Sequence, residues 1–201
     1  MELLFDPEKH LYTVNGNRVP SVTQIIEHWI KVGNRYINVF TGGWVAADMF
    51  EDAAFFGTDA HTMIAYYLDG DLDRDALSPE LNLILQQFIQ WCADYEPQII
   101  DNEIRGYSQK YHFAGTRDLK CIIKNKLYLI DFKTGAYDMA GAQLAGYVQI
   151  DKENDKSRMT RHRNVLHLPK DGSGYKFIPF SDPNDWSFFL SRLTTYNYVR
   201  R

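Results

Sequence analysis

The chain has 201 residues, of which 45% are hydrophobic, 14% aromatic and 24% charged. This is the composition of an ordinary globular domain, and it excludes a disordered tail. The 22 Lys and Arg residues against 26 Asp and Glu residues give a formal net charge of −4, which excludes a binder that works through bulk positive charge. At this length we expect one domain, whose core needs neither disulfides nor a structural metal.

The two cysteines, Cys92 and Cys121, are too few for a disulfide framework, a four-thiolate zinc site or an iron–sulfur cluster ligated only by cysteine. We expect both to be small buried hydrophobic side chains. The N-terminal residues lack a basic region followed by an apolar stretch, and the chain has no apolar run of about 18 residues. The sequence therefore predicts a cytoplasmic protein with no membrane segment.

The first part of the chain is predicted to be a β-hairpin followed by a helix. Residues 3–5 and 11–14 are β-prone, and an Asn-Gly pair that favours a two-residue turn follows them. Ser21 and Gln24 form a capping-box pattern, in which each side chain satisfies a backbone donor at the start of a helix. This helix is predicted to run to about Lys31.

Two longer helices are predicted next. Over residues 44–68 apolar side chains recur every three or four positions, as on one face of a helix, and Gly57 interrupts or breaks that face. A polar loop follows. Ser78 and Pro79 then supply an N-cap and a first-turn proline, which predict a helix that continues to Pro97.

The second half of the chain is predicted to be a β meander followed by mixed elements. The β-prone stretches are residues 99–107, 119–123 and 127–132, with Asn125 and Lys126 in the turn between the last two. A helix over residues 140–150, a strand pair over 164–168 and 175–180, and a helix opened by Asp182 and Pro183 complete the order. This order predicts an α/β domain of the α+β type, with a central mixed sheet flanked by helices.

Two acidic residues, Asp118 and Asp131, are placed by this pattern near the same end of neighbouring strands. If residues 119–123 pair with residues 127–132 as a hairpin, the two carboxylates can approach one another. Two close carboxylates would bind a hard divalent cation.

Asp131 and Lys133 lie two positions apart on one strand, so their side chains share a sheet face while Phe132 points into the core. A lysine there can hold an attacking water and offset negative charge on a phosphate, which suits phosphodiester hydrolysis. The alternative is a solvated ion pair at the end of a strand. The apolar residues 127–130 argue against it, because charges that end a buried strand are costly unless they are paired or bind metal.

Several ordered segments resemble the successive motifs of RecB-like PD-(D/E)xK nucleases. They are Gly-Thr-Arg-Asp at 115–118, Asp-Phe-Lys-Thr at 131–134 and Gln-Leu-Ala-Gly-Tyr at 143–147. Upstream, Gly-Thr-Asp-Ala-His at 57–61 is similar to the first motif of the family, a histidine on a helix ahead of the sheet. Pro-Ser-Val-Thr at 20–23 resembles the N-terminal segment of phage exonucleases and of the mitochondrial genome maintenance exonuclease.

The resemblance implies one nuclease domain over residues 1–201, with helices and a β-hairpin over about 1–97 and a restriction-endonuclease-like core over about 98–201. It implies one or two Mg²⁺ or Mn²⁺ ions and no iron–sulfur cluster, and an imidazole beside carboxylates suits manganese somewhat better. The implied metal ligands are His61, Asp118, Asp131 and the backbone carbonyl of Phe132, and the implied catalytic residues are Asp118, Asp131 and Lys133.

Three further residues enter through the same resemblance. Gln143 and Tyr147 are four positions apart, so a helix puts them on one face. The resemblance implies that they contact nucleic acid or brace the site, and the alternative is a surface glutamine beside a packed tyrosine. Glu103 begins the first core strand and lies near the metal in some relatives, but here we expect it to be structural or to support the site from outside.

Basic residues are scattered, with one denser group between residues 156 and 163. They are Lys120, Lys124, Lys126, Lys156, Arg158, Arg161, His162, Arg163, Lys170, Arg200 and Arg201. They either form solvated faces or line a groove that follows phosphates. In the second case Trp44, Tyr66 or Tyr67 is a candidate for stacking against unpaired bases.

The resemblance implies a metal-dependent DNA nuclease, an exonuclease rather than an endonuclease, that acts on single strands or duplex ends in recombination, repair or phage DNA processing. A recombination or single-strand-binding protein is the implied protein partner. Two alternatives stay open. One is a non-catalytic nucleic-acid-binding module of the same fold, against which the intact Asp118, Asp131 and Lys133 argue, and the other is an unrelated metal-binding or structural α/β protein.

Overall fold

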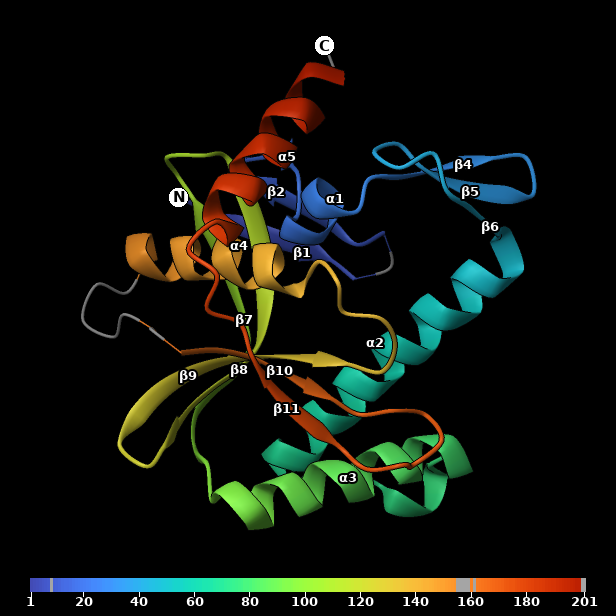
Figure 1. The fold of residues 1–201 in the computed structure, drawn as a ribbon, viewed down its shortest axis with the longest axis vertical. Coiled ribbons are helices and arrows are strands. Elements are labelled where there is room, and N and C mark those ends of the chain that lie inside the picture. The colour runs from blue at the N-terminus through green and yellow to red at the C-terminus, as the bar shows by residue number, and fades with distance from the viewer. Residues whose placement is uncertain (8, 155–159, 161, 200–201) are drawn as a thin grey trace.

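The computed structural model describes residues 1–7, 9–154, 160 and 162–199, and these form three β-sheets and five α-helices (Figure 1). The largest sheet has five strands in the order β11, β10, β9, β8, β7. Their bounds are β7 Gln98–Ser108, β8 Phe113–Ile123, β9 Lys126–Lys133, β10 His162–His167 and β11 Lys176–Pro179. Strands β9 and β10 are parallel and the other neighbours antiparallel, so the predicted central mixed sheet flanked by helices is confirmed.

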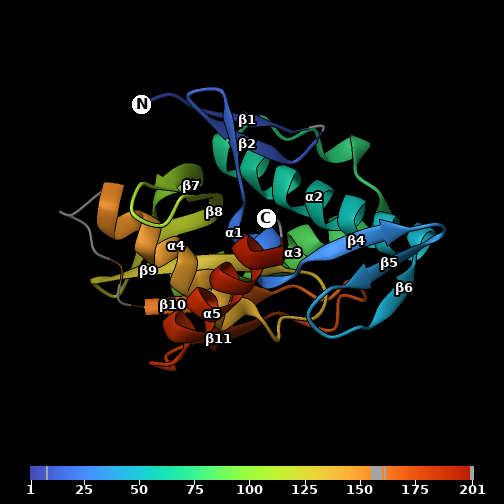
Figure 2. The same cartoon turned by 90° about the horizontal axis from the view of Figure 1, so that it is seen from above.

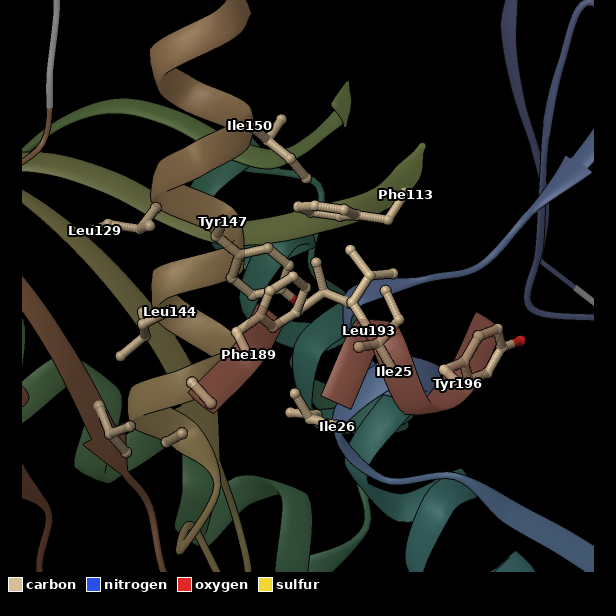
Figure 3. Close-up of a cluster of buried hydrophobic side chains, with 14 residues drawn as sticks. Ile25, Ile26, Phe113, Leu129, Leu144, Tyr147, Ile150, Phe189, Leu193 and Tyr196 are labelled. Carbon is tan, nitrogen blue, oxygen red and sulfur yellow. The ribbon is translucent and has the colours of Figure 1, made fainter. Parts of the chain in front are cut away.

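Helices cover both faces of this sheet. Their bounds are α1 Val22–Ile26, α2 Ala47–Asp69, α3 Pro79–Tyr95, α4 Ala140–Asn154 and α5 Asp185–Val199, and a 3-10 turn, η1 Arg74–Ala76, lies in the predicted polar loop. One apolar cluster joins α1, α4 and α5 to the sheet (Figure 3). A second cluster joins α2 and α3 to the sheet. The predicted caps are present, since Ser21 forms its capping box and Ser78 accepts a hydrogen bond from the backbone of Leu81.

The first small sheet is formed by β1 Leu3–Asp6, β2 Leu11–Val14 and β3 Asn17–Val19. The Asn15–Gly16 turn joins β2 to β3, a strand that the sequence analysis did not predict. Both turn residues have positive φ, which Asn and Gly adopt at low cost. Tyr12 ties this sheet to the centre through a hydrogen bond with Thr116.

The second small sheet was missed by the sequence analysis. The helix predicted to reach Lys31 ends at Ile26, and the following residues form β4 Trp29–Val32, β5 Arg35–Asn38 and β6 Trp44–Ala46. The physical reason is a long-range contact, because Trp29 and Tyr36 both pack on Phe50 of α2. We call residues 29–46 the flap. It lies at the N-terminal end of α2 and away from the central sheet (Figures 1 and 2).

Helix α2 also differs in detail from its prediction. It begins at Ala47, because Trp44 belongs to β6. Gly57 does not break it, and a side chain at that position would meet no other atom within 4 Å. The glycine therefore lies on an open side of the helix, where its effect is limited to a weaker helix propensity.

Strand β8 begins six residues earlier than predicted. Near Asp118 its alternating side chains switch from one face of the sheet to the other. Phe113 belongs to the cluster under α4 and α5, whereas Leu119 and Cys121 belong to the cluster under α2 and α3. In a straight strand these three side chains would share one face. The strand therefore turns at Asp118, opposite Glu103 of β7, whose φ of 46° marks a local irregularity.

The remaining differences are small. The turn between β8 and β9 is Lys124–Asn125, one residue earlier than predicted, and both residues have the positive φ of a tight hairpin turn. Cys121 is buried, as predicted, and Cys92 is only half-buried. Among the described residues no helix is both long and apolar enough to cross a membrane.

Candidate metal centre and active site

The β8–β9 hairpin sets the position of the two predicted acids. Its register ends with the pair Leu119 and Ile130, and Asp118 and Asp131 follow directly beyond that pair. Because β8 begins at Phe113, Asp118 lies in the middle of β8 and not at a strand end as predicted. Asp118 accepts a hydrogen bond from the backbone N–H of Phe132 through Oδ2 at 2.7 Å. This bond fixes the Asp118 carboxylate beside β9. The structure therefore brings the two acids together as the spacing predicted.

His61, in the middle of α2, lies directly over this end of the hairpin. Its Nε2 is 3.1 Å from the carbonyl oxygen of Phe132, and its Nδ1 is 3.4 Å from Oδ1 of Asp118. The ring also packs edge-on against the Phe132 ring. The histidine, one carboxylate and the backbone carbonyl named as metal ligands therefore lie within direct contact.

Glu103, which we expected to be structural or to support the site from outside, lies close to His61 and Asp118. Its Oε1 is 4.0 Å from Nδ1 of His61, and His61, Glu103 and Asp118 each offer a ligand atom within 4.8 Å of the others. Glu103 has positive φ in the middle of a strand, a strained conformation for a side chain of this kind. No local sequence pattern signals such a φ value, so the sequence alone does not predict how close this carboxylate lies to His61.

Asp131 and Lys133 share a sheet face, as their spacing predicted. Lys133 Nζ lies 2.6 Å from Oδ2 of Asp131, whereas Phe132 points into the second apolar cluster. Asp131 is only 1% exposed, and neither of its oxygens accepts a well-aligned hydrogen bond from any described residue. Its one described polar partner is the lysine ammonium. We call His61, Glu103, Asp118, Asp131 and Lys133 the carboxylate cluster.

The acids of this cluster have opposed pKa shifts. Burial raises the pKa of Asp131 to about 6, although Lys133 opposes the shift. Burial, and after it the charge of Asp118, raises the pKa of Glu103 to about 7. For Asp118 burial acts in the same direction, but the charge and hydrogen bond of His61, the charge of Lys133 and the Phe132 N–H together outweigh it and lower the pKa below its usual value.

The two bases of the cluster stay protonated. Burial favours neutral His61, but the charge and hydrogen bond of Asp118, together with the charge of Asp131, outweigh it and raise the His61 pKa to about 9. Burial likewise favours neutral Lys133, yet Asp131 and Asp118 raise the Lys133 pKa above its usual value. Three carboxylates thus face two cations. Because carboxylates outnumber cations in this cluster, a further cation would be attracted to it.

The donor set fits a divalent metal ion. Imidazole nitrogen, carboxylate oxygen and backbone carbonyl oxygen are ligands of Mg²⁺, Mn²⁺ and related cations. The 3.1 Å between His61 Nε2 and the Phe132 oxygen also suits two adjacent ligands of an octahedral ion, which lie about 3 Å apart when each is about 2.1 Å from the metal. Oδ1 of the buried Asp131 carboxylate, which has no hydrogen-bond partner among the described residues, supplies further ligand capacity. These donors do not single out one ion.

Gln143 and Tyr147 lie on one face of α4, as predicted. Gln143 Nε2 donates to the Tyr147 hydroxyl at 3.0 Å, and both side chains are buried. Burial raises the Tyr147 pKa well above its usual value, and the charges of Asp131 and Asp118 add to it. Gly115 allows this approach, because a Cβ there would lie 2.7 Å from the Tyr147 ring. Tyr147 therefore lies within electrostatic range of Asp131 and Asp118, and Gln143 is bonded to it.

A second buried ionic group lies next to the first. Asp151 of α4 pairs with Arg117 through Oδ1, and its Oδ2 lies 3.1 Å from Lys120 Nζ and accepts a hydrogen bond from Thr160 at 3.0 Å. We call these four residues the Asp151 network. Both oxygens of its carboxylate have partners. Lys120 is buried in this network, so it belongs neither to a solvated face nor to a groove that follows phosphates.

The other basic and aromatic candidates are either part of the packed structure, exposed, or outside the described residues. Arg163 pairs with Asp185 and donates to the carbonyl of Gly141, so its role is structural. Tyr67 packs against Phe88, whereas Trp44 and Tyr66 are exposed. Lys156, Arg158, Arg161, Arg200 and Arg201 lie outside the described residues.

Comparison with known proteins adds little. No family model matches the chain, and no curated protein matches it. Among solved structures the chain is similar to the crystal structure of SSO0001, with 12% sequence identity and a TM-score of 0.38. The match covers 72% of this chain and 75% of that chain. A similarity at this level carries no argument about function, so the functional argument depends on the site itself.

Proposed function

We propose that the chain is a metal-dependent deoxyribonuclease of the PD-(D/E)xK type, with a restriction-endonuclease-like core, and that it acts as an exonuclease. One observation carries the proposal. Asp118, Asp131, Lys133, His61 and the Phe132 carbonyl come from positions up to 72 residues apart and meet at one end of the β8–β9 hairpin. Carboxylates for a cation beside a lysine for a phosphate are the groups that phosphodiester hydrolysis needs.

His61, Asp118, Asp131 and the Phe132 carbonyl would hold the cation, with Glu103 as an additional carboxylate. A bound Mg²⁺ or Mn²⁺ supplies Lewis-acid polarisation of the phosphoryl group and lowers the pKa of water. Binding the cation through His61 requires a neutral imidazole nitrogen, so the proton that the metal-free ring carries must leave.

Lys133 acts in this proposal as a fixed cation and not as a base. Its raised pKa keeps the ammonium protonated at neutral pH, and Asp131 holds it 2.6 Å away on the same sheet face. From there it can donate a hydrogen bond to the attacking water or to a phosphate oxygen. Gln143 and Tyr147 brace the cluster, because both are buried and bonded to one another. The pathway we assign is recombination, repair or phage DNA processing in the cytoplasm.

The test is degradation of end-labelled linear single-stranded, linear duplex and circular DNA in Mg²⁺, Mn²⁺ or EDTA. We expect metal-dependent loss of linear DNA and survival of circles, because an exonuclease needs an end. Asp131→Ala should abolish this loss, whereas Asp101→Asn, which changes an exposed acid on the same sheet, should not.

Three results would change the proposal. Cleavage of circular DNA would make the protein an endonuclease. Binding without cleavage in any metal would favour the non-catalytic module of the same fold. Wild-type cleavage by Asp131→Ala would remove the basis of the assignment.

A further inference from the structure

The two faces of the flap are chemically different. The register places Trp29, Lys31 and Tyr36 on one face, which packs on the first turns of α2. Tyr36 stacks on Phe50 with ring centroids 4.2 Å apart, and Lys31 lies 2.6 Å from Oε1 of Glu51. This inner face is therefore occupied by α2.

The outer face of the flap has no partner among the described residues. The same register places Ile30, Val32, Arg35, Ile37 and Trp44 on it. Ile30 and Val32 are exposed, and Trp44 is 60% exposed. The guanidinium of Arg35 lies over the Trp44 indole at 4.2 Å. Trp44 therefore exposes apolar surface on the sheet, and an arginine covers only one side of its ring. Leaving this surface in water is unfavourable, and a ligand that covers it would remove that cost.

The charge of this region differs from that of the whole chain. The net charge of the chain is −4, yet residues 28–47 include Lys31 and Arg35 and no Asp or Glu. Lys31 is neutralised by Glu51 on the inner face, but Arg35 forms no ion pair with any described residue. Arg192 of α5 lies over the ring of Phe40, in the β5–β6 connection, at 4.1 Å, and it too has no ion pair within the described ranges. Arg35 is therefore the unpaired charge on the outer face of the flap, and the nearest acids in the chain, Glu27 and Asp48, lie just outside residues 29–46.

We propose that the outer face of the flap binds an unpaired DNA strand, with a base stacked on Trp44 and with phosphates near Arg35 and Arg192. The inference rests on the proposed nuclease function for its choice of ligand and adds a preference for single strands. Aromatic stacking on unpaired bases together with a few cations is how proteins hold single strands without reading sequence. A paired base offers no free face to Trp44, so a blunt duplex gains nothing from this contact.

The geometry also gives a length requirement. Fourteen residues of α2 separate Ala47, where the flap ends, from His61, which is a rise of about 21 Å at 1.5 Å per residue. A stacked strand covers that distance with about six nucleotides at 3.4 Å each. A strand much shorter than this cannot reach both the carboxylate cluster and Trp44.

The experiment measures binding of fluorescein-labelled oligo(dT) by anisotropy, in an Asp131→Asn background that prevents cleavage. The probes are a 20-mer, a 4-mer and a blunt 20-base-pair duplex. We expect Trp44→Ala to weaken binding of the 20-mer by about 5-fold to 100-fold, with no effect on the duplex. The 4-mer should bind the parent more weakly than the 20-mer does, because it cannot reach both Trp44 and the carboxylate cluster. Arg35→Gln should reduce the slope of log affinity against log salt by about 0.7.

The matched control is Tyr198→Ala, which removes an aromatic ring that is 75% exposed on α5. It should bind the 20-mer as the parent does, and circular dichroism should show that all variants are folded. Unchanged 20-mer binding by Trp44→Ala overturns the inference, and so does an equal loss with the duplex. A change in sedimentation coefficient without a change in DNA binding would instead assign the face to a second copy of the chain.

This readout is independent of cleavage. If the wild type cleaves no DNA but binding of the 20-mer depends on Trp44, the flap inference stands and the nuclease function fails. If the wild type cleaves DNA and Trp44→Ala binds the 20-mer normally, the nuclease function stands and the flap inference fails.

Discussion

Two buried ionic groups lie next to each other on strand β8, and they differ in how completely their charges are satisfied. In the Asp151 network, Asp151 has cations or donors at both oxygens, and Arg117 also donates to the carbonyl of Ile104. In the carboxylate cluster, the oxygens of Asp131 accept no well-aligned hydrogen bond from the described residues, and the pKa of Asp131 is raised. The first group is electrostatically closed, and the second is open to another cation.

The difference teaches how to separate structural from functional buried charges. A buried ion pair with every lone pair satisfied can be broken only at a large cost in stability. A cluster with surplus carboxylate charge is costly as it stands and gains when a cation binds. Adjacent residues of one strand, Arg117 and Asp118, therefore belong to groups with opposite expected behaviour on substitution.

The largest expected effect is on activity at Asp131. Asp131→Asn should reduce DNA cleavage by about 10³-fold or more, because it removes a carboxylate from the proposed cation site. Its thermal stability without metal should be close to that of the wild type, since the substitution removes a buried charge with incomplete hydrogen bonding. Rates from single-turnover cleavage and melting curves in EDTA would measure both. A strongly destabilised variant would contradict the description of this cluster as open.

The Asp151 network should give the opposite result. Asp151→Asn should lower the free energy of unfolding by about 3–5 kcal/mol, because it removes the buried negative charge that Arg117 and Lys120 share. The cleavage rate per folded molecule should change much less than in Asp131→Asn. Urea unfolding checks the first value, and activity normalised to the folded fraction checks the second. Equal behaviour of the two variants would erase the contrast.

Divalent cations should sharpen the contrast. At 100 times the dissociation constant, Mg²⁺ or Mn²⁺ binding stabilises the fold by about 2.7 kcal/mol, which for this size corresponds to a rise in Tm of about 5–10 °C. The wild type and Asp151→Asn should both show the rise. Asp131→Asn should lose most of it. A rise of the same size in Asp131→Asn would place cation binding elsewhere.

The smallest expected effect is the pH dependence of stability without metal. The folded-state pKa values of Asp131, Glu103 and His61 are raised to about 6, about 7 and about 9. Each group therefore contributes stability that is present below its unfolded pKa and lost as the pH rises through its folded pKa. In EDTA, the free energy of unfolding should fall between about pH 4 and pH 9.

Asp131→Asn provides the control for this pH dependence. It should lose the contribution of Asp131, which lies between about pH 4 and pH 6, because an amide does not titrate, and it should keep the contributions of Glu103 and His61. Asp118 does not contribute in this window, since its pKa is lowered and its effect appears only at more acidic pH. Urea titrations of the wild type and of Asp131→Asn at several pH values would measure this difference in the free energy of unfolding. A constant difference between wild type and variant over the whole range would refute the raised pKa of Asp131.

Part of the site could be predicted because its geometry is local. The hairpin spacing of 13 residues placed Asp118 and Asp131 at one end of the hairpin, and the two-residue period placed Lys133 beside Asp131. The helical period likewise placed Gln143 and Tyr147 on one face. These relations need only the periodicity of regular structure, so the sequence determines them.

The sequence by itself therefore determined the elements with strong caps and long periodic patterns, including α3 with its Ser78 cap and the β8–β9 hairpin. Tertiary structure alone decided the flap, whose strands of three or four residues exist because Trp29 and Tyr36 pack on Phe50. It also decided that Glu103 joins the carboxylate cluster and that Asp151 neutralises Arg117. Short strands and buried ion pairs depend on partners distant in sequence, and no local propensity encodes such contacts.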